Sequence, residues 1–235
     1  MSIIALVDGD IVAYRCAAAN DKEDVGIAVW QADQMVTRIL SETQADGWEI
    51  YLSGENNFRY QIFPDYKANR RDQPKPRHLE RIREELVTLW GATICDGYEA
   101  DDALGIYQSN SGHDVVYICS IDKDLLQIPG QHYNFVKREF KEVDAFGGAV
   151  QFYTQLLCGD PTDNIRGCPG VGKVKAERAL KGCLTERQLY ERCIGCYKVV
   201  YKDDWEKELT LCANLLYILR SENDVWSPPK LNVNS

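Results

Sequence analysis

Short apolar runs alternate with amphipathic segments through the first half of the chain, and this alternation restricts the folds that it can adopt. The first apolar run, residues 3–8, precedes a segment of helical periodicity with Asp10 as its expected N-cap. Because parallel neighbouring strands need helical crossovers, the pattern predicts a doubly wound, mainly parallel α/β sheet. The further strands are predicted at 48–54, 92–96 and 114–120, and the helices between them at 26–44, 78–90 and 99–110.

This alternation ends at about residue 144. Residues 132–144 alternate like a small hairpin at the edge of the sheet, and only helical runs follow them. We therefore expect an α/β domain over 1–144, a helical subdomain over 145–225 and a loose tail over 226–235. Within the first domain, about residues 55–78 form an irregular, basic excursion with several prolines. An excursion of this length inside a compact domain is usually functional or mobile.

Acidic residues follow the predicted strands at equivalent positions. Ligands of open α/β sheets collect outside the carboxyl ends of the strands, so these acids are expected to converge. A helix cap would explain one such acid, but it does not explain five groups at the same topological position. The nine acids are Asp8, Glu55, Glu99, Asp101, Asp102, Asp122, Asp124, Asp160 and Asp163.

Carboxylates gathered in this way require a cation, because they would otherwise repel one another. Oxygen ligands without His or Cys favour Mg²⁺ or Mn²⁺ over zinc. Two such ions about 4 Å apart would hold the attacking and leaving oxygens of an in-line phosphodiester displacement. The sequence therefore predicts metal-dependent phosphodiester hydrolysis without a covalent enzyme intermediate.

The net charge of −9, from 27 basic and 36 acidic residues, argues at first against a polyanionic substrate. Setting the nine acids aside leaves 27 residues of each sign, so the excess charge is assigned to the metal site. The remaining basic residues form two groups, for which we predict phosphate contacts, with a solvated surface as the alternative. They are Lys67, Arg70, Arg71, Lys75 and Arg77 in the excursion, and Arg166, Lys173, Lys175 and Arg178 after the last acids.

A Gly-rich turn, residues 169–172, directly follows the last acidic group. Glycine lets the backbone approach a partner closely, and a helix that begins near Lys173 presents free amides beside a lysine. We therefore predict an anion site that binds the backbone of a nucleic-acid duplex. The alternative is a connection between two helices without a binding role.

The cysteines and the N-terminus bear on the cellular compartment. Cys193 and Cys196 match half of a zinc-ligand spacing, but a second pair and a nearby His are lacking, so buried free thiols are expected. The first apolar run has no basic segment before it, and no apolar run approaches the roughly 18 residues of a membrane span. We expect a cytoplasmic protein.

Five segments, in this order along the chain, resemble the 5'-nuclease family: LVDGD, FPDYKANRR, YEADDALG, SIDKDLLQI and GDPTDNIRGCPGVGKVKA. The family comprises flap endonucleases and 5'-3' exonucleases, and the resemblance is to its short bacteriophage members especially. It implies a PIN-like fold with a helical arch, which would correspond to the excursion over about residues 55–78, and a helix-hairpin-helix-type element. It also implies two Mg²⁺ ions that Mn²⁺ can replace, and hydrolysis of DNA with 5' ends, flaps or nicks, RNA–DNA hybrid included. A role in primer removal or DNA degradation during phage replication, in the host cytoplasm, would follow.

The resemblance also implies roles for single residues. Lys67 and Arg70 would hold the scissile phosphate, and Tyr66 would stack on a terminal base unless it packs in the core. The first metal group would be Asp8, Glu99, Asp101 and Asp122, and the second Asp124, Asp160 and Asp163, with Asp102 acting through water and Glu55 standing where several relatives have Asp. Further nucleic-acid contacts would come from Arg71, Gly170, Gly172, Lys173 and Lys175, and the resemblance allows K⁺ at the Gly170–Gly172 turn.

Two other functions are compatible with parts of this pattern. A PIN-type ribonuclease acting on single-stranded RNA would share the acids but would need neither the Gly-rich turn nor Asp160 and Asp163. A non-catalytic DNA-binding scaffold would have lost metal ligands, and none is missing. The sequence favours the nuclease. Because no polymerase segment or sliding-clamp tail follows the helical subdomain, we expect a free-standing enzyme, and we also expect a monomer.

Overall fold

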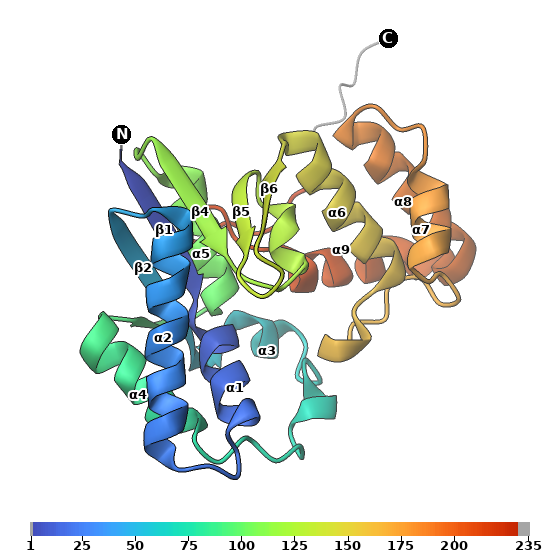
Figure 1. The fold of residues 1–235 in the computed structure, drawn as a ribbon. Helices are drawn as coiled ribbons and strands as arrows, with labels where there is room; N and C mark the ends of the chain where they lie inside the picture. The colour runs from blue at the N-terminus through green and yellow to red at the C-terminus, as the bar shows by residue number, and fades with distance from the viewer. Residues whose placement is uncertain (1, 230–235) are drawn as a thin grey trace. The chain divides into compact units, whose positions relative to one another are not determined.

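The fold is built on a six-stranded sheet with the strand order β3-β2-β1-β4-β5-β6 (Figure 1). This computed structural model describes residues 2–229. Neighbouring strands are parallel except for the antiparallel pair β5–β6, which confirms the predicted mainly parallel sheet and its edge hairpin. The strands are β1 (Ile3–Asp8), β2 (Gly47–Asn57), β3 (Thr93–Gly97), β4 (Val115–Cys119), β5 (Gly130–Asn134) and β6 (Glu139–Val143).

The chain divides into two units, which are described separately. The sheet unit contains the residues up to Phe58, Pro74–Val143 and Leu219–Glu222. The helical unit contains Arg59–Gln73, Asp144–Ile218 and the described residues from Asn223 onward. The expected boundary near residue 144 is present. Two segments, however, belong to the unit other than the one expected: 59–73 packs with the helices, and 219–222 packs with the sheet.

Arg59 provides a physical reason for the first of these differences. Its side chain is buried, and its Nε donates to the carbonyl oxygen of Leu215 at 2.9 Å. Its Nη2 donates to the carbonyl oxygen of Tyr217 at 2.7 Å. These contacts connect positions more than 150 residues apart, so the sequence pattern around the arch gave no sign of them.

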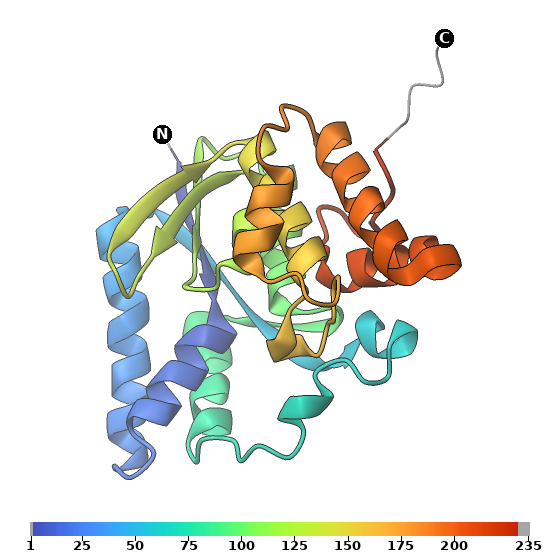
Figure 2. The ribbon, with the colours of Figure 1, turned by 90° about the vertical axis from the view of Figure 1, so that its right-hand side faces the viewer.

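Helices pack on both faces of the sheet. Apolar side chains of α1 (Gly9–Ala19), α2 (Val25–Thr43) and α4 (Leu79–Trp90) form one core with the strands, and the three helices lie together in Figure 2. In β1, Ala5 and Val7 belong to that core. Because side chains alternate along a strand, Asp8 points to the opposite face, where α5 (Ala100–Asn110) packs. The acid that ends β1 and the acids that begin α5 therefore lie on the same face of the sheet.

The start of α1 differs from the prediction. Asp8, rather than Asp10, is the N-cap, because β1 passes directly into the helix without a loop and the Asp8 side chain accepts the N–H of Ile11. Asp10 instead lies in the first helical turn and contacts residues of other elements. The N-cap prediction for Asp10 is therefore wrong.

The helical unit has a core of its own. Tyr153, Leu156 and Tyr197 are fully buried in it. Its helices are α6 (Ala145–Cys158), α7 (Lys173–Leu180), α8 (Glu186–Tyr201) and α9 (Trp205–Leu216), and the arch segment adds most of α3 (Phe58–Ile62). The residues predicted as a tail begin with a packed side chain: Trp226 is buried against the rings of Phe152 and Tyr190. A large indole removes much apolar surface from water when it packs, so the predicted tail is wrong at this position, whereas 230–235 lie outside the described residues.

All nine cysteines are free, as expected, and Cys193 is buried in the core of the helical unit. Among residues 2–229, no helix has the length and apolar character needed to cross a membrane.

Candidate active site

Asp8 lies at the carboxyl end of β1 with only 1% of its surface exposed. Its Oδ1 accepts the N–H of Ile11 at 3.0 Å, and its Oδ2 accepts the hydroxyl of Ser120 at 2.6 Å. Ser120 directly follows β4, the strand beside β1, so this contact ties the ends of two neighbouring strands together. Sequence analysis missed Ser120, although a polar residue at the end of a buried strand was the available signal.

The pKa of Asp8 is raised from 3.8 to about 7, mainly by burial and to a smaller extent by the negative charges of Asp10 and Asp122. The hydrogen bonds from Ser120 and Ile11 act in the opposite direction and do not offset burial. A carboxylate in this position is stabilised by any cation that binds beside it. The electrostatics of Asp8 therefore fit a metal ligand.

Asp122 and Asp124 lie on the turn that follows β4. The N–H of Asp122 donates to Ser120 Oγ at 3.0 Å, and Asp122 Oδ1 accepts the N–H of Asp124 at 2.9 Å. Ser120 thus contacts both the Asp8 carboxylate and the backbone of Asp122. This arrangement explains why the charge of Asp122 acts on Asp8.

Asp102 holds the start of α5. Its Oδ2 accepts the N–H of Glu99 at 3.0 Å, and the Glu99 side chain accepts a backbone N–H in return, which makes a capping box. Its Oδ1 accepts the N–H of Leu219 at 3.0 Å, and the side chain is fully buried. Asp102 therefore has a structural role in the sheet unit, and its action on a metal through water stays a prediction.

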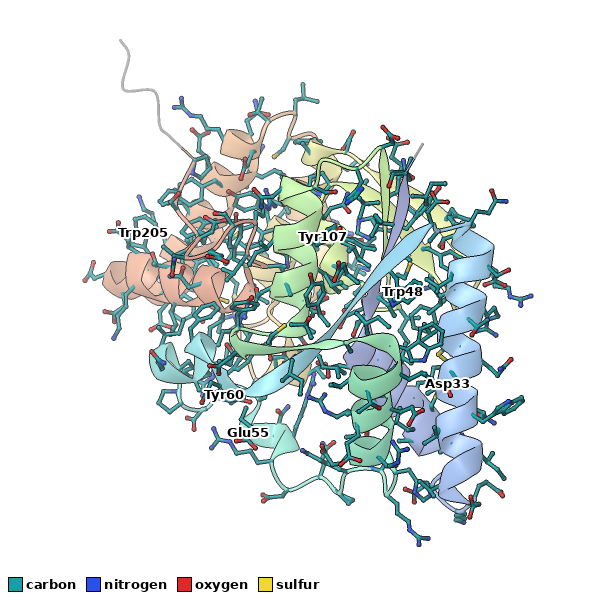
Figure 3. The ribbon with its side chains drawn as sticks, turned by 90° about the vertical axis from the view of Figure 1, so that its left-hand side faces the viewer. Asp33, Trp48, Glu55, Tyr60, Tyr107 and Trp205 are labelled. Atoms are coloured by element: carbon teal, nitrogen blue, oxygen red, sulfur yellow. The ribbon has the colours of Figure 1, made fainter. Side chains whose placement is uncertain are left out.

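Two further observations place the remaining acids of the sheet unit. Burial raises the pKa of Cys95 to about 12, with smaller contributions from Asp10, Asp102 and Asp101, so the acids of α5 lie near the middle of β3. Glu55 is exposed on the extended end of β2 (Figure 3), within the irregular part of the pairing with β3 between Ser53 and Asn57. Its ligand role stays a prediction.

Asp163 lies in the helical unit within a cluster of arch residues. Its Oδ1 pairs with Arg70 Nη2 at 2.5 Å, and its Oδ2 lies 3.7 Å from Lys67 Nζ. The hydroxyl of Tyr66 donates to the same Oδ2 at 3.1 Å. Asp160 is the N-cap of the short 3₁₀ helix Pro161–Asp163, and its side chain accepts the N–H of Thr162 at 2.8 Å. The predicted phosphate-binding cations are thus ion-paired with a predicted metal ligand.

Tyr66 is 2% exposed and belongs to the core of the helical unit. A ring that stacks on a terminal base must be accessible. The structure therefore agrees with the alternative in which Tyr66 packs in the core, and its role as a stacking residue is corrected.

The Gly-rich turn has the expected local structure. The N–H of Val171 donates to the carbonyl of Cys168 at 3.0 Å, with Pro169 and Gly170 as the central residues and Gly170 at a φ of +78°. These are the positions that Pro and Gly favour in a type II turn. Helix α7 begins at Lys173, as predicted, and Lys175 Nζ donates to the Gly170 carbonyl at 2.8 Å. The turn is therefore held by a cation from the helix that follows it.

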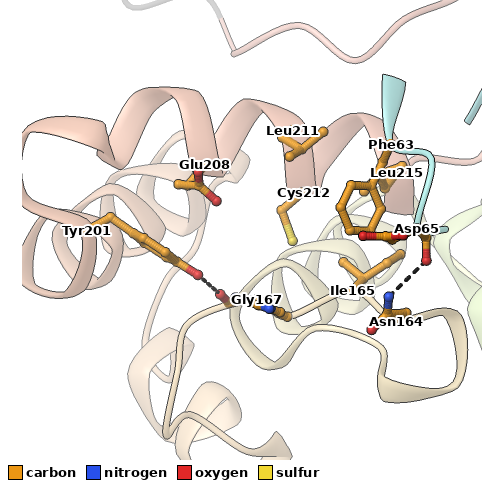
Figure 4. A pocket seen from close by; sticks show the side chains of 11 residues that line it. Phe63, Asp65, Asn164, Ile165, Gly167, Tyr201, Glu208, Leu211, Cys212 and Leu215 are labelled. Carbon is orange, nitrogen blue, oxygen red and sulfur yellow. Dashed lines mark hydrogen bonds between the residues drawn. The ribbon is translucent and has the colours of Figure 1, made fainter. Parts of the chain in front are cut away.

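A pocket of about 290 Å³ lies elsewhere in the helical unit (Figure 4). Asp65 and Glu208 line it together with Arg166 and an apolar floor that includes Phe63. The Tyr201 hydroxyl donates to the Gly167 carbonyl at 2.6 Å at its edge. Two acids beside one arginine do not give the positive potential that a phosphate requires, so this pocket is a poor candidate for a phosphate site.

The predicted ligands are divided between the units: Asp160 and Asp163 belong to the helical unit and the others to the sheet unit. Among residues 2–229, no three His, Cys, Asp or Glu side chains stand in positions to hold one metal ion. Mg²⁺ usually keeps several waters and takes only one or two carboxylates from the protein. The oxygen-only donor set around the buried Asp8 therefore fits a hydrated divalent ion.

A mainly parallel sheet with carboxylates at the ends of its strands defines a PIN-like α/β nuclease fold. The chain belongs to the 5'-3' exonuclease family, because the family described as "5'-3' exonuclease, N-terminal resolvase-like domain" matches residues 3–152. DNA polymerase I of Geobacillus stearothermophilus is 30% identical in an alignment of 203 positions that covers 76% of this chain and 23% of that protein. The 5'-3' exonuclease of Buchnera aphidicola is 26% identical in an alignment of 210 positions that covers 80% of this chain and 72% of that protein.

The chain thus spans about a quarter of the length of the DNA polymerase I relative. Among solved structures, a T5 5'-exonuclease with bound zinc aligns with a TM-score of 0.65 and 17% identity over 92% of this chain and 100% of that one. The catalytic core of Rad2 in complex with DNA substrate aligns with a TM-score of 0.58 and 14% identity, over 97% of this chain and 84% of that one. At these identities the likeness concerns the fold.

Proposed function

We propose that the protein is a divalent-metal-dependent 5' nuclease that hydrolyses phosphodiesters of DNA at 5' ends, flaps or nicks. The observation that carries this proposal is the buried carboxylate of Asp8, joined through Ser120 to Asp122 at the carboxyl ends of two parallel strands. Family membership and the zinc bound by the T5 relative support it. We further propose primer removal or DNA degradation, by a cytoplasmic monomer, as its role.

Two Mg²⁺ ions, replaceable by Mn²⁺, would activate a water and stabilise the charge that develops on the phosphate. Asp8, Glu99, Asp101 and Asp122 are proposed as ligands of one ion, and Asp124, Asp160 and Asp163 as ligands of the other, with Asp102 acting through water and Glu55 beside them. The hydrogen bonds to Asp8 orient its carboxylate before an ion arrives. The acids otherwise repel one another, and this repulsion favours uptake of cations.

Lys67 and Arg70 are proposed to contact the scissile phosphate. Both are ion-paired with Asp163 in the substrate-free protein, and the three side chains keep 17–43% of their surface exposed. An ion that binds Asp163 would compete for this carboxylate and leave the two cations to the phosphate. Tyr66, through its hydroxyl on Asp163, is proposed to hold the carboxylate in place rather than to contact DNA.

The Gly-rich turn is proposed to grip the backbone of the duplex. Exposed Gly170, Gly172, Lys173 and Lys175 lie together at the start of α7, where free amides point outward. Added Cβ atoms at the two glycines would meet no atom within 4 Å, so this backbone is open to a partner. Arg71 is a further contact from the arch, and K⁺ at the carbonyls of the turn is part of the proposal.

The test is cleavage of a 5'-labelled flap duplex in Mg²⁺. D122N should lose cleavage by at least about 100-fold, because it removes a charge that completes the metal site. D114N is the matched control, since Asp114 lies at the opposite end of β4 and accepts the N–H of Ser2. D114N should cleave like the unmodified protein, and equal cleavage by D122N would contradict the assignment.

The same assay separates the alternatives. A single-stranded RNA cleaved faster than the DNA flap at equal concentration would favour a PIN-type ribonuclease. Binding of the flap without cleavage of either substrate, in Mg²⁺ and in Mn²⁺, would favour a non-catalytic scaffold.

A further inference from the structure

Arg83, Asp10 and Ser53 form a hydrogen-bonded network in the sheet unit, and none of them is among the predicted ligands. Asp10 Oδ1 pairs with Arg83 Nη1 at 2.5 Å, and Asp10 Oδ2 accepts the N–H of Ser53 at 2.9 Å. Arg83 Nη2 donates to the carbonyl oxygen of Ser53 at 2.6 Å. The Arg83 side chain is only 20% exposed, so these charge-assisted bonds are largely shielded from water.

The network reaches α5 through the side chain of Ser53. Ser53 Oγ accepts the N–H of Ala100 at 2.9 Å. Ala100 is the first residue of α5 and lies between Glu99 and Asp101 in the chain. Ser53 of β2 therefore fixes the start of α5, beside which the predicted ligands Glu99 and Asp101 lie.

The network reaches Asp8 through the first turn of α1. Asp10 lies in that turn, and Asp8 is its N-cap. A Cβ added at Gly9 would lie 2.6 Å from the carbonyl oxygen of Tyr51, so the turn packs directly against β2. Both carboxylate oxygens of Asp10 accept bonds from other elements, which keeps this acid away from a ligand role.

We propose that Arg83 is a positioning residue for the metal site, acting through Asp10 and Ser53 to hold the helix starts that present Asp8, Glu99 and Asp101. This inference rests on the proposed function. An arginine suits the role, because two nitrogens of its planar guanidinium serve Asp10 and Ser53 at the same time. Outer-shell partners of metal ligands typically change metal affinity by about 10- to 100-fold.

The test measures Mn²⁺ binding to the full chain by calorimetry, without substrate. R83M should weaken binding by at least about tenfold, and R83K should lie between R83M and the unmodified protein, because an ammonium cannot keep both contacts. S53A removes only the acceptor for Ala100 and should weaken binding less than R83M does. The double variant R83M/D10N should bind no more weakly than R83M alone, since Arg83 acts through Asp10.

The matched control is R81M. Arg81 lies on the same helix and pairs with Glu85 on the surface at 2.7 Å, so its removal makes the same change in charge without touching the network. R81M should bind Mn²⁺ like the unmodified protein.

Thermal unfolding in chelator identifies the variants that fold. If R83M does not fold, the Mn²⁺ affinities of R83K and S53A test the positioning role of Arg83. Folded R83K and S53A with unchanged Mn²⁺ affinity would overturn the positioning role, as would an equal loss in R81M. No Mn²⁺ binding by the unmodified protein would instead contradict the proposed function itself.

Discussion

At the scale of single residues, Asp8 is a side chain whose position opposes folding. Its pKa of about 7 in the folded protein lies above the ordinary value of 3.8, and the largest cause is burial. Between pH 4 and pH 7 the unfolded chain therefore releases a proton that the folded chain retains. Stability due to this residue is present at low pH and is lost as the pH rises toward 7, which is the sign expected for a raised acidic pKa.

D8N removes this ionisation, so its stability relative to the unmodified protein should improve as the pH rises. In chelator, the difference in unfolding free energy should shift in favour of D8N by up to about 4 kcal/mol between pH 4 and pH 8, and it should level off above pH 7. Urea unfolding at several pH values measures this. A pH-independent difference for D8N would contradict the assigned pKa.

Asp10 shows where reasoning from the sequence stops at this scale. An acid two positions after a strand is expected to cap the helix that follows, and local sequence contains nothing against this interpretation. Its actual partner, Arg83, is 73 positions away on another helix. The seven acids of the sheet unit could be chosen from predicted strand-end positions, whereas Asp160 and Asp163 follow helix α6 and not a strand. The residues that orient the acids, such as Ser53 and Ser120, act through tertiary contacts.

At the scale of elements, the loop between α6 and α7 is closed by a close backbone contact between Gly159 and Gly167. Asp160 and Ile165 exchange backbone hydrogen bonds at 2.8 and 2.9 Å. A Cβ at Gly159, whose φ is +67°, would lie 2.3 Å from the Ile165 carbonyl oxygen. This loop carries Asp163, so the predicted ligand depends on a backbone path that only glycine permits at this position.

G159A and G170A should therefore differ in their effect on stability. Both glycines have positive φ, but a Cβ at Gly170 meets no atom within 4 Å. G170A should cost about 1 kcal/mol of unfolding free energy, from backbone strain alone. G159A should cost about 3 kcal/mol or more, because the loop backbone of residues 165–167 must also move. Urea titration followed by circular dichroism measures both, and equal losses would show that the close contact at Gly159 does not exist in solution.

The elements themselves were largely predictable. Periodicity identified the parallel strands, their crossover helices and the edge hairpin, because each pattern reflects burial on one or two faces of a sheet. The arch segment was less predictable. Its irregular sequence showed no periodicity, and its place in the helical unit depends on contacts such as that of Tyr66 with Asp163, which are 97 positions apart.

At the scale of the whole molecule, the proposed function must reconcile a net charge of −9 with a polyanionic substrate. The basic residues proposed to contact DNA must be concentrated in one region of the surface, because the net negative charge of the whole protein repels phosphate. Lys173 and Lys175 are exposed at the start of α7 beside the open turn. Lys173 pairs with Glu177 at 3.9 Å within α7, and Lys75 pairs with Glu80 at 3.7 Å, which agrees with the solvated alternative for Lys75.

The salt dependence of duplex binding should distinguish phosphate contacts made by the Gly-rich turn from a general effect of net charge. K173M/K175M should reduce the slope of log affinity against log salt concentration by about 2, because each phosphate contact contributes about 0.9. K137M/K141M makes the same change in net charge at exposed positions of the β5–β6 hairpin and should leave the slope unchanged. Fluorescence anisotropy of a labelled duplex, measured in Ca²⁺ so that cleavage does not intervene, gives both slopes. Equal reductions in the two double variants would mean that the total charge, and not the turn, governs binding.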